Sequence, residues 1–138
     1  MATPVRISEA ASLGMHATVL LVANAGRPMS TAAMAAMMGV SQAHLSKVLQ
    51  RLARLGLVTS VRGPHGGFLL SRRADQITLG QVYEAIEGPL SPSTCLLGRP
   101  ICSGRQCILG GVLQRASGEV GRYLDGTMLS ELADVYER

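Results

Sequence analysis

Apolar residues in the first part of the chain recur at the three- and four-residue spacing that is typical of amphipathic helices. This pattern predicts a first helix over residues 6–24, a short second helix over 31–38 and a third over 42–55. Ser30 and Ser41 stand where the second and third helices begin, and a serine there can accept a hydrogen bond from an unpaired backbone N–H. Predicted packing residues of these two helices are Met34, Met37, Met38, Leu45, Val48, Leu49, Leu52 and Leu55.

A short turn from Gly39 to Ser41 separates the second and third predicted helices. Two helices joined by a Gly-containing turn of three or four residues form the helix-turn-helix arrangement. The outer face of the third helix carries hydrogen-bonding and cationic side chains, which are the types that contact bases and phosphates. An amphipathic helix of any function also has a polar outer face, so the helix pair alone leaves both interpretations open. The side chains on this face are Gln42, His44, Lys47, Gln50, Arg51 and Arg54.

A hairpin is predicted directly after the third helix. Residues 57–61 and 68–70 have strand composition, and the loop between them, Arg62-Gly63-Pro64-His65-Gly66-Gly67, is rich in Gly. A Gly-rich loop can also cradle nucleotide phosphates, but this one lacks the Lys-Ser/Thr ending of a P-loop. Helix, helix, strand, loop, strand is the order of a winged helix, whose Arg-bearing wing can lie along a minor groove.

A capping box at residues 78–81 opens a fourth predicted helix, which Gly88 and Pro89 close. Residues 89–107 are irregular, a helical pattern resumes over 108–124, and residues 128–138 are predicted to form a last short helix. The long helix has no evident core of its own chain to cover. We therefore expect it to pair with its copy in a homodimer, which also suits a palindromic operator.

These elements predict a mainly α (α+β) fold, with a winged helix-turn-helix domain and a long C-terminal dimerisation helix. The predicted divisions are a DNA-binding domain over residues 1–88, a Cys-containing loop over 89–107, and the dimerisation helix with the last short helix over 108–138.

Charge is distributed unevenly along the 138 residues, whose net charge is +4. Residues 1–75 carry eight Lys or Arg and two acids, whereas the remainder carries five Arg and seven acids. A basic half joined to an acidic half fits a nucleic-acid reader with a control segment, although an ordinary solvated surface has the same composition.

Several classes of protein have no support in the sequence. The chain lacks an apolar run of the roughly 18 residues that a membrane span needs, and its N-terminus lacks the features of a signal peptide, so we expect a cytoplasmic protein. No carboxylate pair, Ser–His–Asp set or Cys–His nucleophile stands out. We therefore expect no enzymatic activity.

Three cysteines, Cys95, Cys102 and Cys107, lie within thirteen residues of the irregular loop. An odd number argues against a disulfide scaffold, and the spacing differs from the paired cysteines of structural zinc sites. Clustered thiolates on a loop shaped by Gly and Pro are what an iron–sulphur cluster requires. Arg99 and Arg105 flank them and would favour the thiolate form, although they also fit a solvated turn.

A fourth ligand is absent from this loop. His16, Ser12 and Glu9 share one face of the first predicted helix, and His44 and His65 fall on the presumed DNA surface. His16 is also compatible with an ordinary core histidine.

The chain resembles a known family, the Rrf-type bacterial transcriptional regulators. The resemblance covers nearly the whole chain and is most specific in three stretches: RISEAASLGMHA, GVSQAHLSKVLQRLARLGLVTSVRGPHGGFLL and ITLGQVYEAIEGPL. The three-Cys loop followed by ILGGVL stands where cluster-binding members carry theirs.

The resemblance implies that residues 42–55 enter the major groove and that residues 62–67 form a minor-groove wing, with residues 108–124 as the dimer helix. It also implies that Cys95, Cys102 and Cys107 bind a [2Fe–2S] or [4Fe–4S] cluster. The DNA-contacting residues are then Ser41, Gln42, His44, Lys47, Arg51, Arg62, Gly63, His65 and Gly66.

One group of family members places a His three residues after the third Cys, where this chain has Gly110. Other members take the missing ligand from the first helix of the partner subunit, at positions that match Ser12 and His16. The resemblance therefore favours His16 acting in trans, with Glu9 or a small molecule as alternatives.

The sequence predicts a homodimeric regulator of double-stranded DNA whose affinity depends on a Cys-bound iron–sulphur cluster, and thereby on redox state, nitric oxide or iron supply. A cluster-free regulator that uses a thiol switch or a small-molecule effector is the alternative within the same fold. A redox or metal-trafficking protein that does not bind DNA could use the same cysteines, but the basic first half and the wing argue against it.

Overall fold

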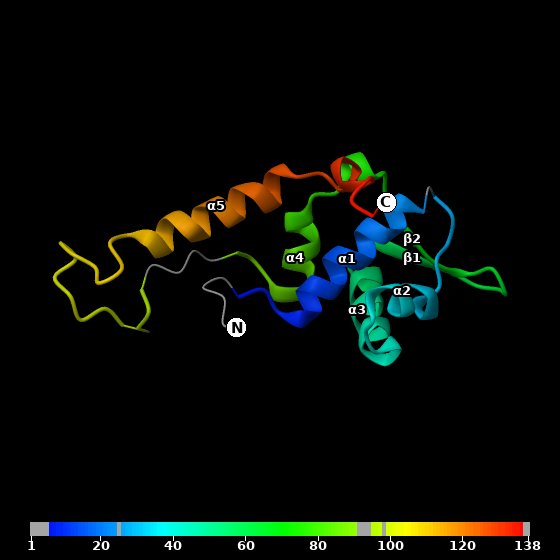
Figure 1. Cartoon of the computed structure of the whole chain (residues 1–138), viewed down its shortest axis with the longest axis horizontal. Helices are drawn as coiled ribbons and strands as arrows, with labels where there is room; N and C mark the ends of the chain where they lie inside the picture. The colour runs from blue at the N-terminus through cyan, green and yellow to red at the C-terminus, as the bar shows by residue number, and fades with distance from the viewer. Residues whose placement is uncertain (1–5, 25, 91–94, 98, 137–138) are drawn as a thin grey trace.

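The computed structural model describes residues 6–24, 26–90, 95–97 and 99–136. Figure 1 shows helices and a hairpin gathered into one body, from which a long helix projects. The helices are α1 (Glu9–Ala23), α2 (Thr31–Met38), α3 (Gln42–Arg54), α4 (Leu79–Glu87) and α5 (Val112–Gly126). The remaining elements are β1 (Val58–Val61), β2 (Gly67–Leu70) and the 3-10 turns η1 (Ala74–Gln76) and η2 (Leu129–Leu132).

Helix starts follow the predicted capping chemistry. The side chains of Ser30 and Ser41 accept hydrogen bonds from backbone N–H groups of α2 and α3, and Ser8 does the same for α1. Thr78 and Gln81 form the complete capping box of α4. Gly39 ends α2 with φ +67°, a left-handed conformation that lets the chain turn sharply into α3.

The core lies where α1 packs against α3 and α4. Gly14 lies at this contact, where an added Cβ would be in ordinary van der Waals contact with side chains of Val48, Val82 and Ile86. Buried side chains from every helix fill the same core, including Leu124 of α5, and Leu129 closes it from η2. The largest fully buried side chains are Met34, Leu45, Leu49, Leu52, Ile77, Val82 and Leu129.

β1 and β2 pair antiparallel in the register Val58↔Leu70 to Val61↔Gly67, which confirms the predicted hairpin. Met29, in the segment before α2, extends this sheet by an isolated bridge to Phe68. A second bridge, between Thr78 and Met128, fastens the chain after α5 to the chain before α4. The C-terminal end of α5 is thus held to the body, while its N-terminal end lies away from it (Figure 1).

Four predictions about packing and boundaries were wrong. Leu55 and Met37 are 55 % and 63 % exposed, because Leu55 already caps α3 and Met37 faces outward from α2. α5 begins at Val112 rather than residue 108, since Gly110 and Gly111 both have positive φ. Of the last short helix predicted over residues 128–138, the described part forms only the four-residue 3-10 helix η2 (Leu129–Leu132) followed by turns, and residues 137–138 lie outside the described residues. Within the described residues no helix is long and apolar enough to cross a membrane.

Candidate functional site

The outer face of α3 presents the polar side chains that the sequence predicts. Ser41 caps this helix by accepting a hydrogen bond from the His44 N–H at 3.3 Å, which fixes the first turn. Leu45, Val48, Leu49 and Leu52 hold the opposite face in the core. The helix is therefore rigidly mounted with a cationic, hydrogen-bonding surface turned to solvent. The exposed residues of this surface are Ser41, Gln42, Lys47, Gln50, Arg51 and Arg54.

His44 is half-buried rather than fully exposed, because α1 lies beside it. Its Nδ1 is 3.7 Å from the Oε1 of Glu9, in the first turn of α1. The sequence places Glu9 on one helical face with Ser12 and His16, but the structure turns the Glu9 carboxylate toward α3. No periodicity within either helix could have indicated this pair, since it depends on how two helices pack.

The wing projects from the body as a loop between β1 and β2 (Figure 1). Arg62, Gly63 and His65 are exposed on it, whereas Gly66 is partly covered. A Cβ on Gly66 would collide with the Val61 carbonyl, and one on Gly67 with the Met29 backbone. The Gly residues thus let the hairpin close tightly and let its base lie against the segment before α2.

His16 is exposed on α1 and is oriented by its own helix. Its Nδ1 lies 2.7 Å from the Ser12 carbonyl oxygen and 3.3 Å from the Ser12 hydroxyl. A hydrogen bond to a carbonyl uses the Nδ1 proton, so Nε2 is the ring nitrogen left for another partner. The structure therefore presents His16 as an accessible, oriented imidazole and not as a core histidine.

The cysteines lie on the irregular segment that precedes α5. Cys102 is exposed, Cys95 and Cys107 are half-buried, and none of the three forms a disulfide in the described part of the chain. Backbone N–H groups of Leu97 and Leu109 donate to the Sγ atoms of Cys95 and Cys107 at 3.4 and 3.5 Å. Among the described residues, no group of three His, Cys, Asp or Glu is close enough to hold a metal. This segment lies at the far end of the molecule from α1 (Figure 1).

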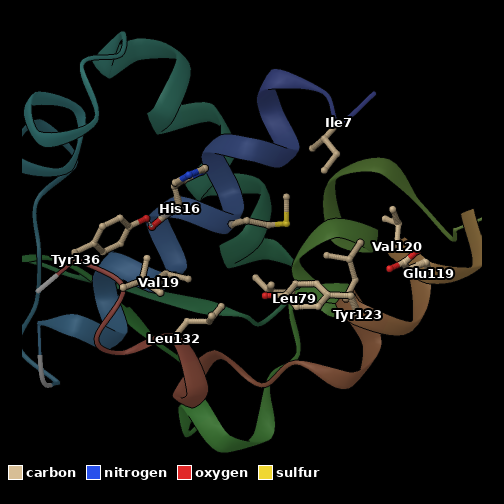
Figure 2. Close-up of a pocket in the computed structure, with 12 residues that line it drawn as sticks. Ile7, His16, Val19, Leu79, Glu119, Val120, Tyr123, Leu132 and Tyr136 are labelled. Atoms are coloured by element: carbon tan, nitrogen blue, oxygen red, sulfur yellow. Dashed lines mark hydrogen bonds between the residues drawn. The ribbon is translucent and has the colours of Figure 1, made fainter. Parts of the chain in front are cut away.

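A hollow of about 640 Å³ opens between α1, α5 and the C-terminal segment. No pattern in the sequence predicts it. Figure 2 shows Tyr136 beside His16 and Val19, with Tyr123 near Leu79 on the other side. The Tyr136 hydroxyl donates to the His16 carbonyl oxygen at 3.5 Å, and burial raises the pKa of this tyrosine. Since residues far apart in the chain form its walls, only the folded structure reveals it.

The arrangement of α2, α3 and the wing defines a winged helix-turn-helix protein. Residues 7–135 match the Rrf2 family, described as iron-dependent transcriptional regulators. The chain belongs to the Rrf2 family. This is a family of transcriptional regulators and not of enzymes, as the sequence predicts.

The chain is similar to proteins named IscR in sequence and to a protein named CymR in structure. The HTH-type transcriptional regulator IscR of Erwinia tasmaniensis is 37 % identical over 100 residues, which are 72 % of this chain and 60 % of that protein. IscR of Escherichia coli O1:K1 is 32 % identical over 120 residues, or 86 % of this chain and 73 % of that one. The fold matches the solved structure of CymR, the global cysteine regulator of B. subtilis, with a TM-score of 0.80 and 28 % sequence identity. The match covers 96 % of this chain and 99 % of CymR.

Proposed function

We propose that this chain is a homodimeric, DNA-binding transcriptional regulator in which α3 reads the major groove and the wing contacts the minor groove. The observation that carries this proposal is the exposed cationic face of α3, mounted rigidly on a buried apolar face. Gln42, His44 and Lys47 lie nearest the bases, and Arg51 further along the helix extends the contact. Ser41, Arg62, Gly63, His65 and Gly66 complete the interface.

The dimer is proposed to form through α5. This helix lies beside α4 for part of its length but leaves large apolar side chains in solvent: Ile108, just before it, is 91 % exposed, and Val112 and Tyr123 on it are 47 % and 58 % exposed. Pairing with a second copy would remove this surface from water. It would also place two α3 helices for half-sites about 34–36 Å apart.

The cysteine segment is proposed to hold an iron–sulphur cluster through Cys95, Cys102 and Cys107. The donor set fits such a group: three thiols lie within thirteen residues, and two of them already accept backbone N–H groups, as cluster-ligating sulphurs do. When bound, a cluster supplies one-electron chemistry and sensitivity to oxidants and nitric oxide. The three cysteines lie in the connection between α4 and α5, so a bound cluster would link the reading domain to the dimer helix.

The fourth ligand is proposed to be His16 of the second subunit. The His16 Nε2 is available because Nδ1 is engaged with Ser12, whereas Glu9 is already directed toward His44. The cysteines of the same chain lie far from α1, which favours a ligand supplied by the other copy (Figure 1). His16→Ala should therefore reduce cluster stability without changing the folding of the isolated chain, because the side chain is exposed.

DNA binding is tested by first selecting a duplex from a random library and then measuring its affinity at several salt concentrations. We expect the logarithm of the binding constant to fall linearly with the logarithm of salt, with a steep slope from phosphate contacts. A protein without salt-dependent retention on duplex DNA would contradict the proposed function, whatever its iron content.

A cluster-free regulator of the same fold is the second candidate. The hollow beside α1 favours it, since its volume falls in the range of small-molecule sites and it touches both the reading domain and α5. The exposed Cys102 would allow a thiol switch as well. Protein that stays colourless after reconstitution with iron and sulphide, yet binds DNA, would favour this candidate over the first.

A further inference from the structure

Glu9 is an acid placed at the edge of the proposed DNA surface. Its carboxylate is 73 % exposed and lies 3.7 Å from Nδ1 of His44, the third residue of α3. Such a position repels phosphates, so this residue weakens general attraction to DNA. The first turn of α1 also holds Ser8, whose hydroxyl contacts Glu87 of α4, and this tie fixes the start of α1 against the body.

From this geometry we propose that Glu9 is a positioning residue for DNA readout and acts through His44. The carboxylate faces the Nδ1 edge of the imidazole and favours a ring orientation with that edge turned toward α1. Nε2, on the other side of the ring, is then the atom available to a base edge. The proposal rests on the proposed function, since it assumes that the first turn of α3 meets DNA.

The surroundings of His44 single out Glu9 as its charged partner. Neither α2 nor β1, which both pack on α3, contains a titratable residue. α4 contributes Tyr83, Glu84 and Glu87, of which Glu87 contacts Ser8. On α3 itself the neighbouring charge is Lys47, three residues further along the helix, which is exposed.

Glu9→Gln is expected to change specific and general binding in opposite directions. Selectivity for the selected duplex over duplexes with single base-pair changes should fall about two- to fivefold, the factor that an exposed ion pair is worth. This loss should be confined to the base pair that His44 contacts. Affinity for unrelated duplex DNA should rise, because a negative charge is removed from the interface.

The experiment measures affinities of the full chain for the selected duplex, its single-base variants and an unrelated duplex. Five proteins are compared: unsubstituted, Glu9→Gln, His44→Ala, the double variant, and Glu84→Gln as a matched loss of an exposed acid on α4. The proposal requires that Glu9→Gln cause no further loss of selectivity when His44 is already Ala, and that Glu84→Gln leave selectivity unchanged.

Three outcomes would overturn it. Equal weakening on all duplexes would show that Glu9 serves only the fold, and additive effects in the double variant would show that it does not act through His44. Selectivity unchanged in Glu9→Gln would show that it positions nothing. Failure of the unsubstituted protein to bind any duplex would instead contradict the proposed function itself.

Discussion

The winged-helix body and the segment from Cys95 through α5 bury their apolar side chains in different ways. In the body, α1, α3 and α4 enclose one another, and Leu45, Leu49 and Leu52 are fully buried. In the second region Leu124 is the buried residue of α5, while Ile101 and Ile108 before it are 85 % and 91 % exposed. The body therefore has a well-enclosed core, to which α5 adds Leu124. The second region has apolar surface that a second subunit would cover.

The candidate functional side chains of the two regions are also supported differently. The exposed polar side chains of α3, which are proposed to face DNA, are mounted on the core of the same chain, so one chain alone sets their geometry. The thiols of Cys95, Cys102 and Cys107 are on irregular backbone, and the imidazole proposed to join them is on α1, far from that segment (Figure 1). Each proposed DNA-reading surface thus lies within one subunit, whereas sensing is proposed to require residues of two.

The largest expected effect is the loss of the cluster in Cys102→Ala. This variant removes one of the three proposed thiolate ligands, so visible absorption and bound iron should disappear from anaerobically purified protein. Ser103→Ala, at the next position, should keep both. Retention of the spectrum in Cys102→Ala would show that this thiol is not a ligand.

Val112→Glu should separate the two regions by breaking the dimer. A charge placed in an apolar interface without a partner should weaken self-association ~100-fold, which analytical ultracentrifugation measures. The monomer should retain the helical content of the body. Ser130→Glu, which adds the same charge at an exposed position of η2, should remain dimeric. A Val112→Glu dimer as stable as the original would place the interface elsewhere.

Gly67→Ala tests the rigidity of the body. The new Cβ would collide with the Met29 backbone, and φ +148° is unfavourable for Ala, so the free energy of unfolding should fall by about 2 kcal/mol. Thermal unfolding followed by circular dichroism measures this loss. Gly126→Ala, where a Cβ meets open space, should not be destabilised. Equal melting temperatures for the two variants would contradict the close packing of Gly67 against the Met29 backbone at the base of the wing.

Arg62→Ala has the smallest expected effect. Loss of one cation from the wing should weaken operator binding about fivefold and flatten its salt dependence by about one charge. Arg122→Ala removes an equal charge from α5 and should leave DNA affinity unchanged. Unchanged affinity in Arg62→Ala would remove the wing from the interface.

The sequence predicted the body well because its signals are local. Apolar spacing defines α3, Thr78 and Gln81 define the start of α4, and the Gly-rich loop defines the wing. The predicted start of α5 was wrong because backbone angles decide it: Gly110 and Gly111 have positive φ, so the helix begins only at Val112.

Features that depend on packing between distant elements could not be predicted. The Glu9–His44 pair joins two helices, and the hollow at Tyr136 needs the C-terminal segment laid against α1. Cys95, Cys102 and Cys107 could be identified as candidate ligands from their close spacing in the sequence. Their joint role as ligands remains a prediction, as does that of His16.

The most direct test of the account is the ultraviolet–visible spectrum of protein purified without oxygen, measured with iron and acid-labile sulphide. The account predicts a brown protein that absorbs between roughly 300 and 450 nm, with iron and sulphide in matching amounts. A colourless protein that reconstitution does not change would contradict the cluster and leave a DNA-binding regulator with a different sensor.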